Sequence, residues 1–262
     1  MGDILQKIVE SKRVELASTE FADIESRARG CCRPILSMRE SLANSKSGII
    51  AEFKRRSPSK GWINEAAEAA IIPLGYYNAG ASACSVLTNR EYFGGTLQDL
   101  IDARKAAPNL PILRKEFIID ERQIYEARVA GADAILLIAS CLTPERCAEL
   151  SAVAKSVGLE ILLELHSHAE LAHINPMVDM VGVNNRNLGS FHTDIQNSVE
   201  LYSVIREAAR EDMVLVSESG LSKPSTILEL RELGYRGFLM GESFMKESDP
   251  AESLHKLIEE LC

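Results

Sequence analysis

The side chains best suited to acid–base chemistry are lysines and glutamates at the ends of short apolar runs. Glu52 and Lys54 lie two residues apart at the end of the run Ile49–Phe53, and Lys115 and Glu164 each come at the end of a further run. Residues two apart on a strand point to the same face. A buried carboxylate or ammonium is costly unless it is paired or takes part in chemistry. These four side chains are therefore candidates for an acid–base site, with structural ion pairs as the alternative.

Amide and acidic side chains follow the later apolar runs in the same way. Asn184 and Arg186 come after one run, and Glu218 with Ser219 comes after the next. Opposite charges and partial burial shift the proton affinities of such groups, which is what proton transfer near neutral pH requires. The lysines beside the carboxylates disfavour magnesium. We therefore expect an acid–base site without a metal.

Small residues follow the last two runs, in Ser219–Gly220 and Gly241–Glu242. Barrel enzymes commonly hold phosphate at this point, on backbone amides that glycine leaves accessible. The pattern predicts a site for a phosphate ester, and two ordinary tight turns are the alternative.

Two further features carry less information. His166 and His168 resemble a pair of metal ligands but fall at the start of a helix after Glu164, so we expect a structural or solvent-facing role for both. The segment Phe93–Gly95 is typical of a flexible loop with an aromatic tip. Such a tip either contacts a planar substrate or packs against the protein.

Short apolar runs alternate with longer amphipathic stretches from about residue 48 onward, which is typical of parallel strands buried on both faces. Eight strands alternating with helices predict one (βα)8 barrel domain, a TIM barrel, over residues 1–262. A doubly wound open sheet is the main rival, but the chain lacks the G-x-G-x-x-G turn of that fold. The predicted strands are Ile49–Phe53, Ala83–Leu87, Ile112–Leu113, Ala134–Ala139, Ile161–Leu165, Met180–Val183, Met213–Val216 and Phe238–Met240. The clearest predicted helices are Leu97–Ala106, Glu121–Ala130, Pro144–Val157, Ser198–Arg210 and Pro224–Leu233.

An N-terminal helical extension, residues 1–47, precedes the first strand. Ile4, Leu5, Ile8 and Val9 recur at helical spacing, and a second apolar set follows around Pro34–Leu42. The extension either plugs the bottom of the barrel or lies over the top and borders the active site. The sequence favours neither arrangement.

Composition excludes several classes of protein. A formal net charge of −9 argues against nucleic acid as a partner, and no segment approaches the roughly 20 apolar residues of a membrane span. The N-terminus lacks the apolar core of a signal peptide, so we expect a cytoplasmic protein. Its cysteines form no C-x-x-C pair, and we expect them to be reduced and structural, without zinc. They are Cys31, Cys32, Cys84, Cys141, Cys147 and Cys262.

Several of these segments together resemble the indole-3-glycerol-phosphate synthases, and the similarity runs in order along the whole chain. The longest is Ile49–Gly61, which contains Glu52 and Lys54. The others are Tyr92–Gly95, Pro111–Phe117, Leu163–Glu164 with His166, Gly182–Leu188 and Ser217–Gly220.

The resemblance implies a (βα)8 fold, no cofactor, and 1-(2-carboxyphenylamino)-1-deoxyribulose 5-phosphate as the substrate. The implied reaction closes a ring and releases carbon dioxide and water. Lys115 matches the general acid of this family, Glu52 and Glu164 match acidic residues of the catalytic centre, and Lys54 matches a lysine that positions substrate and assists proton transfer. Asn184 and Ser219 match polar residues that orient the sugar hydroxyls. Ser57, Gly220, Gly241 and Glu242 match the region around the phosphate, and Phe93, Arg186 and Glu218 complete the predicted substrate-binding set.

Two alternatives remain at this point. One is another phosphate-binding barrel enzyme, such as an isomerase or an aldolase that uses a lysine as a covalent nucleophile. The other is a barrel that binds a phosphosugar or a protein partner without catalysis, although the set Glu52, Lys54, Lys115 and Glu164 argues against it. We expect a monomer that acts on a small phosphorylated molecule.

Overall fold

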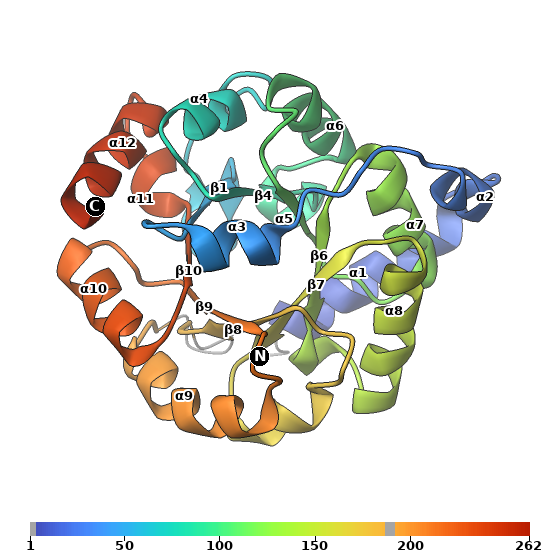
Figure 1. Ribbon diagram of the computed structural model, residues 1–262. Helices are drawn as coiled ribbons and strands as arrows, with labels where there is room; N and C mark the ends of the chain where they lie inside the picture. The colour runs from blue at the N-terminus through green and yellow to red at the C-terminus, as the bar shows by residue number, and fades with distance from the viewer. Residues whose placement is uncertain (1–3, 187–191) are drawn as a thin grey trace.

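Eight parallel strands close into a barrel at the centre of the computed structural model (Figure 1). The structure describes residues 4–186 and 192–262, so Asn187 and Leu188 of the segment that resembles the synthases lie outside the described residues. The order around the barrel is β1-β10-β9-β8-β7-β6-β5-β4. This closed sheet confirms the predicted (βα)8 barrel and is incompatible with a doubly wound open sheet. The strands are β1 (Ile49–Phe53), β4 (Ala83–Leu87), β5 (Ile112–Lys115), β6 (Ala134–Ile138), β7 (Glu160–Leu165), β8 (Met180–Asn184), β9 (Val214–Glu218) and β10 (Gly237–Met240).

Helices form a ring around the barrel. The helix after β7 is the exception, because the chain there forms a 3₁₀ helix, η2 (His168–His173), in place of an α-helix. Thr143 caps α8 (Pro144–Ser156) by accepting a hydrogen bond from the Arg146 amide. The ring consists of α4 (Ile72–Asn78), α6 (Leu97–Ala106), α7 (Glu121–Ala130), α8 (Pro144–Ser156), η2, α9 (Gln196–Ala208), α10 (Pro224–Leu233) and α12 (Pro250–Leu261). Short elements in the loops are the strands β2 (Arg56–Ser57) and β3 (Gly61–Trp62), the helices α5 (Arg90–Phe93) and α11 (Glu242–Met245), and the 3₁₀ helix η1 (Ala139–Cys141).

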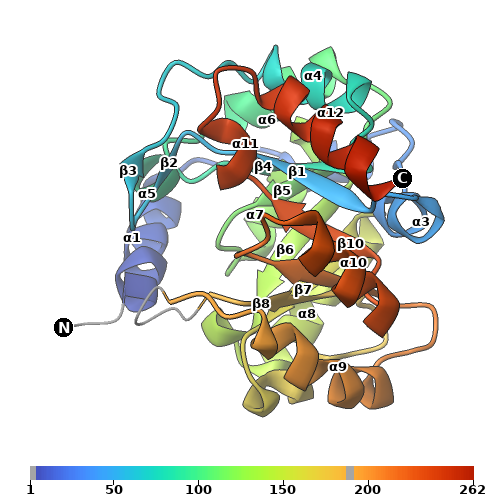
Figure 2. The same ribbon diagram turned by 90° about the vertical axis from the view of Figure 1, so that its left-hand side faces the viewer.

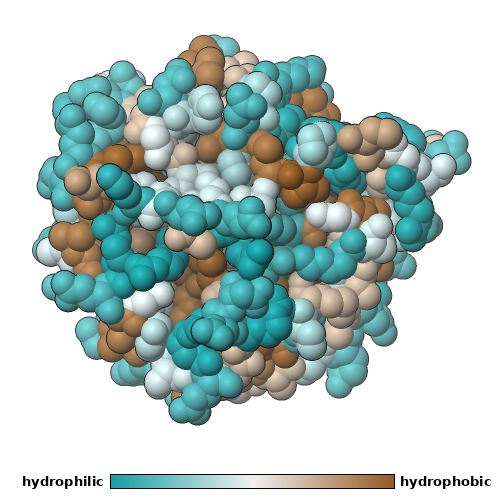
Figure 3. Space-filling model, viewed as in Figure 1, coloured by the Kyte–Doolittle hydropathy of each residue, from teal (hydrophilic) through white to brown (hydrophobic). Residues whose placement is uncertain are grey.

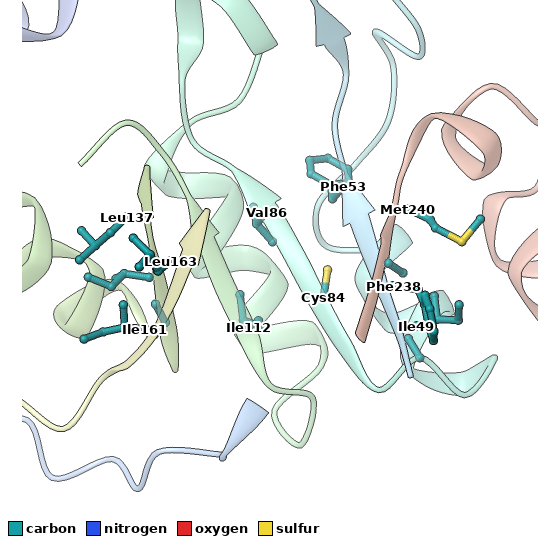
Figure 4. Close-up of a cluster of buried hydrophobic side chains, with 14 of the residues drawn as sticks. Ile49, Phe53, Cys84, Val86, Ile112, Leu137, Ile161, Leu163, Phe238 and Met240 are labelled. Atoms are coloured by element: carbon teal, nitrogen blue, oxygen red, sulfur yellow. The ribbon is translucent and has the colours of Figure 1, made fainter. Parts of the chain in front are cut away.

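Alternation along each strand divides the apolar side chains between two cores. Outward-facing side chains pack against the helix ring, and Figure 4 shows part of this layer around Ile49, Phe53 and Cys84. Inward-facing side chains such as Ile50 and Leu113 fill the barrel interior. Because side chains alternate with a period of two, the polar residues at the strand ends continue the inward rows. The barrel therefore directs Glu52 and Lys115 toward its own axis.

The N-terminal extension covers both ends of the barrel. Helix α3 (Met38–Asn44) closes one end, where Met38 and Leu42 join the interior core. Figure 3, which has the view of Figure 1, shows hydrophilic residues across this end. Helix α1 (Ile4–Ser18) lies at the opposite end, beside β2, β3 and α5 (Figure 2). The two arrangements that the sequence left open are both present, each made by a different helix.

The short helix α2 (Ile24–Arg29) links the two ends by packing on the outside of α7. Arg33, which follows it, donates to the buried Asp133 carboxylate, and Arg104 pairs with the other oxygen of that carboxylate. Asp133 also accepts from the backbone amides of Leu36 and Ile112. Both oxygens of the buried Asp133 carboxylate thus have hydrogen-bond donors, and this cluster anchors the extension on the sheet. The chain before the cluster, which includes α1, extends to the far end of the barrel.

Candidate active site

Lys115 lies at the centre of the polar cluster inside the barrel mouth. Its Nζ is 2.7 Å from Glu218 Oε2, 3.7 Å from Glu52 Oε2 and 3.9 Å from Glu164 Oε2. Lys54 Nζ donates to the other oxygen of Glu52 at 2.6 Å. Two ammonium groups and three carboxylates from four strands thus form one connected ion-pair network. The fold brings together Glu52, Lys54, Lys115 and Glu164, the four acid–base candidates that the sequence predicts.

Burial and neighbouring charges separate the proton affinities of these groups. Burial alone would lower the pKa of the Lys115 ammonium, but attraction to Glu218, Glu52 and Glu164 outweighs burial and raises it. Burial alone would raise the pKa of Glu52, but the charges of Lys54 and Lys115 outweigh burial and lower it. At neutral pH the site therefore holds Lys115 as an ammonium and Glu52 as a carboxylate.

Glu218 is the exception among the carboxylates. It is fully buried, and burial raises its pKa to about 7 in spite of the nearby Lys115 charge. Its Oε1 has no hydrogen-bond partner within the described part of the chain. A Cβ on Gly182 would lie only 2.2 Å from this oxygen. Glycine at position 182 is thus what admits the Glu218 carboxylate into the barrel interior.

Glu164 connects the network to β8 and to the rim. Asn184 Nδ2 donates to Glu164 Oε1 at 3.2 Å, and His166 Nε2 is 3.3 Å from the same oxygen. The sequence predicts a structural or solvent-facing role for both histidines. His168 is exposed, whereas His166 is mostly buried and faces Glu164.

A cavity of about 560 Å³ opens above this network. Ile4, Leu5 and Ile8 of α1 line one wall, so part of the N-terminal extension borders the site. Of the predicted site residues, Glu218 lies beneath Lys115 outside the lining, and Ser57 is buried beside the cavity with no hydrogen-bond partner for its Oγ among the described residues. The predicted residues in the lining are Glu52, Lys54, Phe93, Lys115, Glu164, Asn184, Arg186, Ser219, Gly220, Gly241 and Glu242.

The segments after β9 and β10 form one side of the cavity. Ser219 and Gly220 both have positive φ, 68° and 76°, and a Cβ on Gly220 would meet Thr193 Cγ2 at 2.4 Å. Gly241 precedes α11, and a Cβ there would meet Glu52 at 2.7 Å. Ser243 Oγ is buried without a hydrogen-bond partner in residues 4–186 and 192–262. Glycine at these places keeps the backbone close to the cavity.

Glu242 has its carboxylate neutralised at the cavity mouth. Lys60 Nζ donates to its Oε1, and Arg186 Nη2 is 3.8 Å from its Oε2. Arg186 also donates to Ser59 Oγ at 3.5 Å. Burial would raise the pKa of Glu242, but the Lys60 contact outweighs burial and lowers it. The Glu242 side chain thus ties the loop after β1 to α11.

Phe93 occupies a short helix, not the flexible loop that Phe93–Gly95 predicts. Asn89 caps α5 by accepting from the Tyr92 amide, and Gly94 ends it with a φ of 65°. The Phe93 ring lies 6.1 Å from the Phe117 ring, and both rings line the cavity. The prediction of a loop was wrong for Phe93, because one capping side chain and one left-handed glycine suffice for a single helical turn, whereas Gly94 and Gly95 do lie in the loop that follows.

Sequence reasoning missed several lining residues. The cations Lys60 and Lys246 line the cavity, as does Glu116, which anchors α1 through a buried Lys12 contact at 3.1 Å. Lys60 lies within the segment that resembles the synthases and could have been found from it. Nothing in the sequence places Lys246, which follows the short helix α11.

The described residues contain no group of three or more His, Cys, Asp or Glu side chains arranged to hold a metal ion. Nor does any helix in that part of the chain have the length and apolarity needed to cross a membrane. All six cysteines are described, and none is joined in a disulfide.

Solved structures with a similar backbone are barrels of low sequence identity. One is a chain of the tryptophan synthase α2β2 complex from Pyrococcus furiosus, with a TM-score of 0.61, 15% identity, and 82% of this chain and 97% of that chain covered. Thiamine phosphate pyrophosphorylase from the same organism has a TM-score of 0.59 at 13% identity, covering 82% of this chain and 96% of that one. At this identity the similarity shows the fold alone.

Sequence relatives are much closer. The indole-3-glycerol phosphate synthase of Bacteroides thetaiotaomicron is 50% identical over 261 residues, 98% of each chain. That of Laribacter hongkongensis is 39% identical, covering 98% of this chain and 99% of its own length. The sequence model of the family described as indole-3-glycerol phosphate synthase matches residues 5–257. The chain belongs to the indole-3-glycerol phosphate synthase family, decarboxylating lyases of tryptophan biosynthesis.

Proposed function

We propose that the chain converts 1-(2-carboxyphenylamino)-1-deoxyribulose 5-phosphate into indole-3-glycerol phosphate, with loss of carbon dioxide and water. One observation supports the catalytic roles that we assign to these residues. The Lys115 ammonium lies within 4 Å of three carboxylates at the floor of a cavity that holds a ligand-sized volume. Such an arrangement supplies a proton donor and separate acceptors within reach of one bound molecule.

Lys115 acts in the first step, as the general acid. The ring carbon that bears the carboxylate attacks the ribulose carbonyl, and negative charge develops on the carbonyl oxygen. An ammonium with a raised pKa keeps its proton in the resting site and gives it to an alkoxide, which is more basic. Lys54, held by Glu52, positions the substrate and assists the transfer.

The later steps determine how many protons each turnover takes up from solvent. Breaking the bond to the carboxylate releases carbon dioxide, and the bonding electrons restore the aromatic ring. The carbonyl oxygen leaves as water, so it takes up two protons, while one proton leaves the ring methylene. Glu164 and Glu52 are placed for these transfers, because each lies near Lys115 on the cavity floor. Each turnover therefore consumes one proton net.

Binding groups surround this floor. Asn184 and Ser219 orient the sugar hydroxyls, and Phe93 packs against the anthranilate ring. The phosphate binds at Gly220 and Gly241, with Ser243 and the Ser57 region beside it, where glycines admit close approach and two hydroxyls lack partners among the described residues. Arg186 supplies positive charge at the same mouth, and Glu218 holds Lys115 in place. Phosphate held away from the reacting atoms orients the substrate for ring closure.

The protonation of Lys115 disfavours aldolase chemistry at the same residue. A Schiff base needs a neutral amine with a lowered pKa, whereas the surrounding carboxylates raise the pKa of Lys115. Borohydride added with substrate should therefore trap no covalent adduct. A trapped lysine would replace the general-acid role by a covalent one.

The direct test uses the purified protein and the carboxyphenylamino-deoxyribulose phosphate without added metal or nucleotide. Indole absorbance and fluorescence should rise as product forms. A folded protein that binds the compound and yields no indole product would contradict the proposal. We further propose that the chain works as one domain in the cytoplasm and as a monomer, and sedimentation of the protein with and without substrate would test the monomeric state.

A further inference from the structure

His166 occupies a place that the proposed mechanism leaves unused. Its side chain lies between the catalytic carboxylate Glu164 and the rim residues Ser140 and Glu170. The imidazole is 12% exposed, and the Asn197 side chain donates to its carbonyl oxygen at 3.3 Å. Contacts from β7, η1, η2 and α9 thus fix both the ring and its backbone.

Hydrogen-bond direction sets the tautomer of this ring. The Ser140 hydroxyl has one proton and donates it to Glu170 Oε1. Glu170 is held as an acceptor, because its Oε2 also accepts from the His166 amide at 2.5 Å. Nδ1 of His166, 3.3 Å from Ser140 Oγ, must then be the nitrogen that donates to Ser140.

The consequence falls on the other ring nitrogen. With the proton on Nδ1, a neutral imidazole presents a lone pair at Nε2, which lies 3.3 Å from Glu164 Oε1. Nε2 is buried and has no aligned hydrogen bond in the described residues. A lone pair facing an ionised carboxylate repels it, so the contact is favourable only when one proton lies between the two atoms.

We propose that His166 and Glu164 hold one proton in common, and that this pair is the general acid that supplies the proton consumed in each turnover. The inference rests on the proposed function. Glu164 transfers the proton to the departing hydroxyl, the carbon–oxygen bond breaks with its electron pair on oxygen, and water leaves. The pair regains a proton from solvent when product is released. His166 is a positioning residue here, because it contacts Glu164 and not substrate.

The charges around the pair agree with this assignment. Burial lowers the pKa of the His166 imidazole, and Lys115 acts in the same direction, while Glu170 and Glu218 oppose them. A buried ring that resists protonation stays neutral and remains an acceptor at Nε2 for the shared proton. Asn184 donates to Glu164 Oε1 from β8, and Lys115 lies 3.9 Å from Glu164 Oε2. Asn184 and Lys115 thus fix the Glu164 carboxyl group at the cavity floor.

His166→Gln is the first test, because glutamine fills similar space and forms hydrogen bonds without sharing a proton. Proton transfer by a positioned side chain contributes about 10²- to 10⁴-fold, and a residue that only positions the acid contributes part of this. We therefore expect kcat at neutral pH to fall by about tenfold or more and KM to change by less than about twofold. The pH profile of kcat should also change, because two groups that share one proton titrate together and the glutamine variant has lost one of them. His168→Ala, two residues on and exposed, is the matched control and should behave as the parent.

His166→Ala with added imidazole gives an independent readout. We expect the lost rate to return as imidazole is added, in proportion to its protonated fraction. A purely structural role predicts a loss at every pH and no rescue, and that result would overturn the proposal. So would a His166→Gln variant with the parent's kcat and pH profile. An inactive parent chain would instead contradict the proposed function itself, so the two failures are distinguishable.

Discussion

Lys115 and Glu218 join opposite sides of the barrel through one contact of 2.7 Å. Their strands, β5 and β9, are four positions apart in the closed order of eight, so the pair crosses the barrel axis. Glu52 and Glu164 stand on a second opposed pair of strands, β1 and β7, and both lie within 4 Å of the same ammonium. Lys115 thus stabilises carboxylates that would otherwise repel one another across the barrel.

Replacement of Lys115 tests its role as the general acid. We expect Lys115→Met to lower kcat by about 10²- to 10⁴-fold, because the developing alkoxide loses its proton donor. Circular dichroism should show a folded barrel, and equilibrium dialysis should show that substrate still binds. Lys105→Met, at an exposed position of α6, is the control and should retain parental turnover. Turnover of Lys115→Met within a few-fold of the parent would remove Lys115 from this role.

Glu218 should make stability depend on pH. Its pKa is about 7 in the folded protein and near the ordinary 4.5 when unfolded, so the folded state binds more protons between these values. The contribution of Glu218 is therefore favourable at low pH and is lost as pH rises from about 4.5 through 7. We expect Glu218→Gln to gain stability relative to the parent across this window, by at most about 3 kcal/mol.

Urea unfolding at several pH values between 5 and 8 measures this difference. Glu229→Gln, at an exposed position of α10, should show no comparable trend. A Glu218→Gln variant whose stability relative to the parent is constant over the window would mean that the Glu218 carboxyl titrates normally. Loss of the carboxylate should also lower turnover, because Lys115 loses its nearest partner.

The sequence predicts the barrel and most of the site for a simple reason. Side chains alternate along a strand, so Glu52 and Lys54 fall on one face, and the polar residues that end the apolar runs gather at one mouth of the barrel. Alternation also puts Arg114 and Lys115 on opposite faces, and in the structure it is Arg114 that faces outward and donates to Glu126 of α7. The order of residues along a strand is therefore enough to predict which of its side chains share a face.

Features that depend on closure of the barrel could not be predicted in this way. The sequence does not say that Glu218 reaches Lys115 across the axis, or that α1 and α3 cover opposite ends. It also gives no reason to place Ser57 behind the cavity wall, because the β2–β3 turn decides that. His166 was expected to be structural or solvent-facing, since its contact with Glu164 depends on how η1 and η2 surround the ring.

Gly182 tests how closely the Glu218 carboxylate is fitted. An added methyl group would approach Glu218 Oε1 within 2.2 Å, so Gly182→Ala must displace the carboxylate from Lys115. We expect a loss of about 1–3 kcal/mol in stability and a fall in kcat of about tenfold to a hundredfold. Gly30→Ala at the end of α2, where φ is −80°, is the control and should change neither quantity strongly. Parental kcat in Gly182→Ala would show that Glu218 need not hold its observed position.

Lys12 and Arg13 are neighbours on α1 that should behave very differently. Lys12 is buried and donates to the buried Glu116 at 3.1 Å, whereas Arg13 forms an exposed pair with Glu10. Removing one partner of a buried ion pair leaves the other charge uncompensated, which costs about 3–5 kcal/mol, while exposed pairs contribute about 0–1 kcal/mol.

We therefore expect Lys12→Met to release α1 and Arg13→Met to leave it docked. Amide hydrogen exchange in α1 should accelerate in Lys12→Met alone. Because Ile4, Leu5 and Ile8 of the same helix line the cavity, KM should rise in that variant as well. Equal exchange and equal KM in the two variants would mean that apolar packing holds α1 on the barrel without help from the buried pair. Faster exchange with unchanged KM would mean that the α1 wall of the cavity is dispensable for binding substrate.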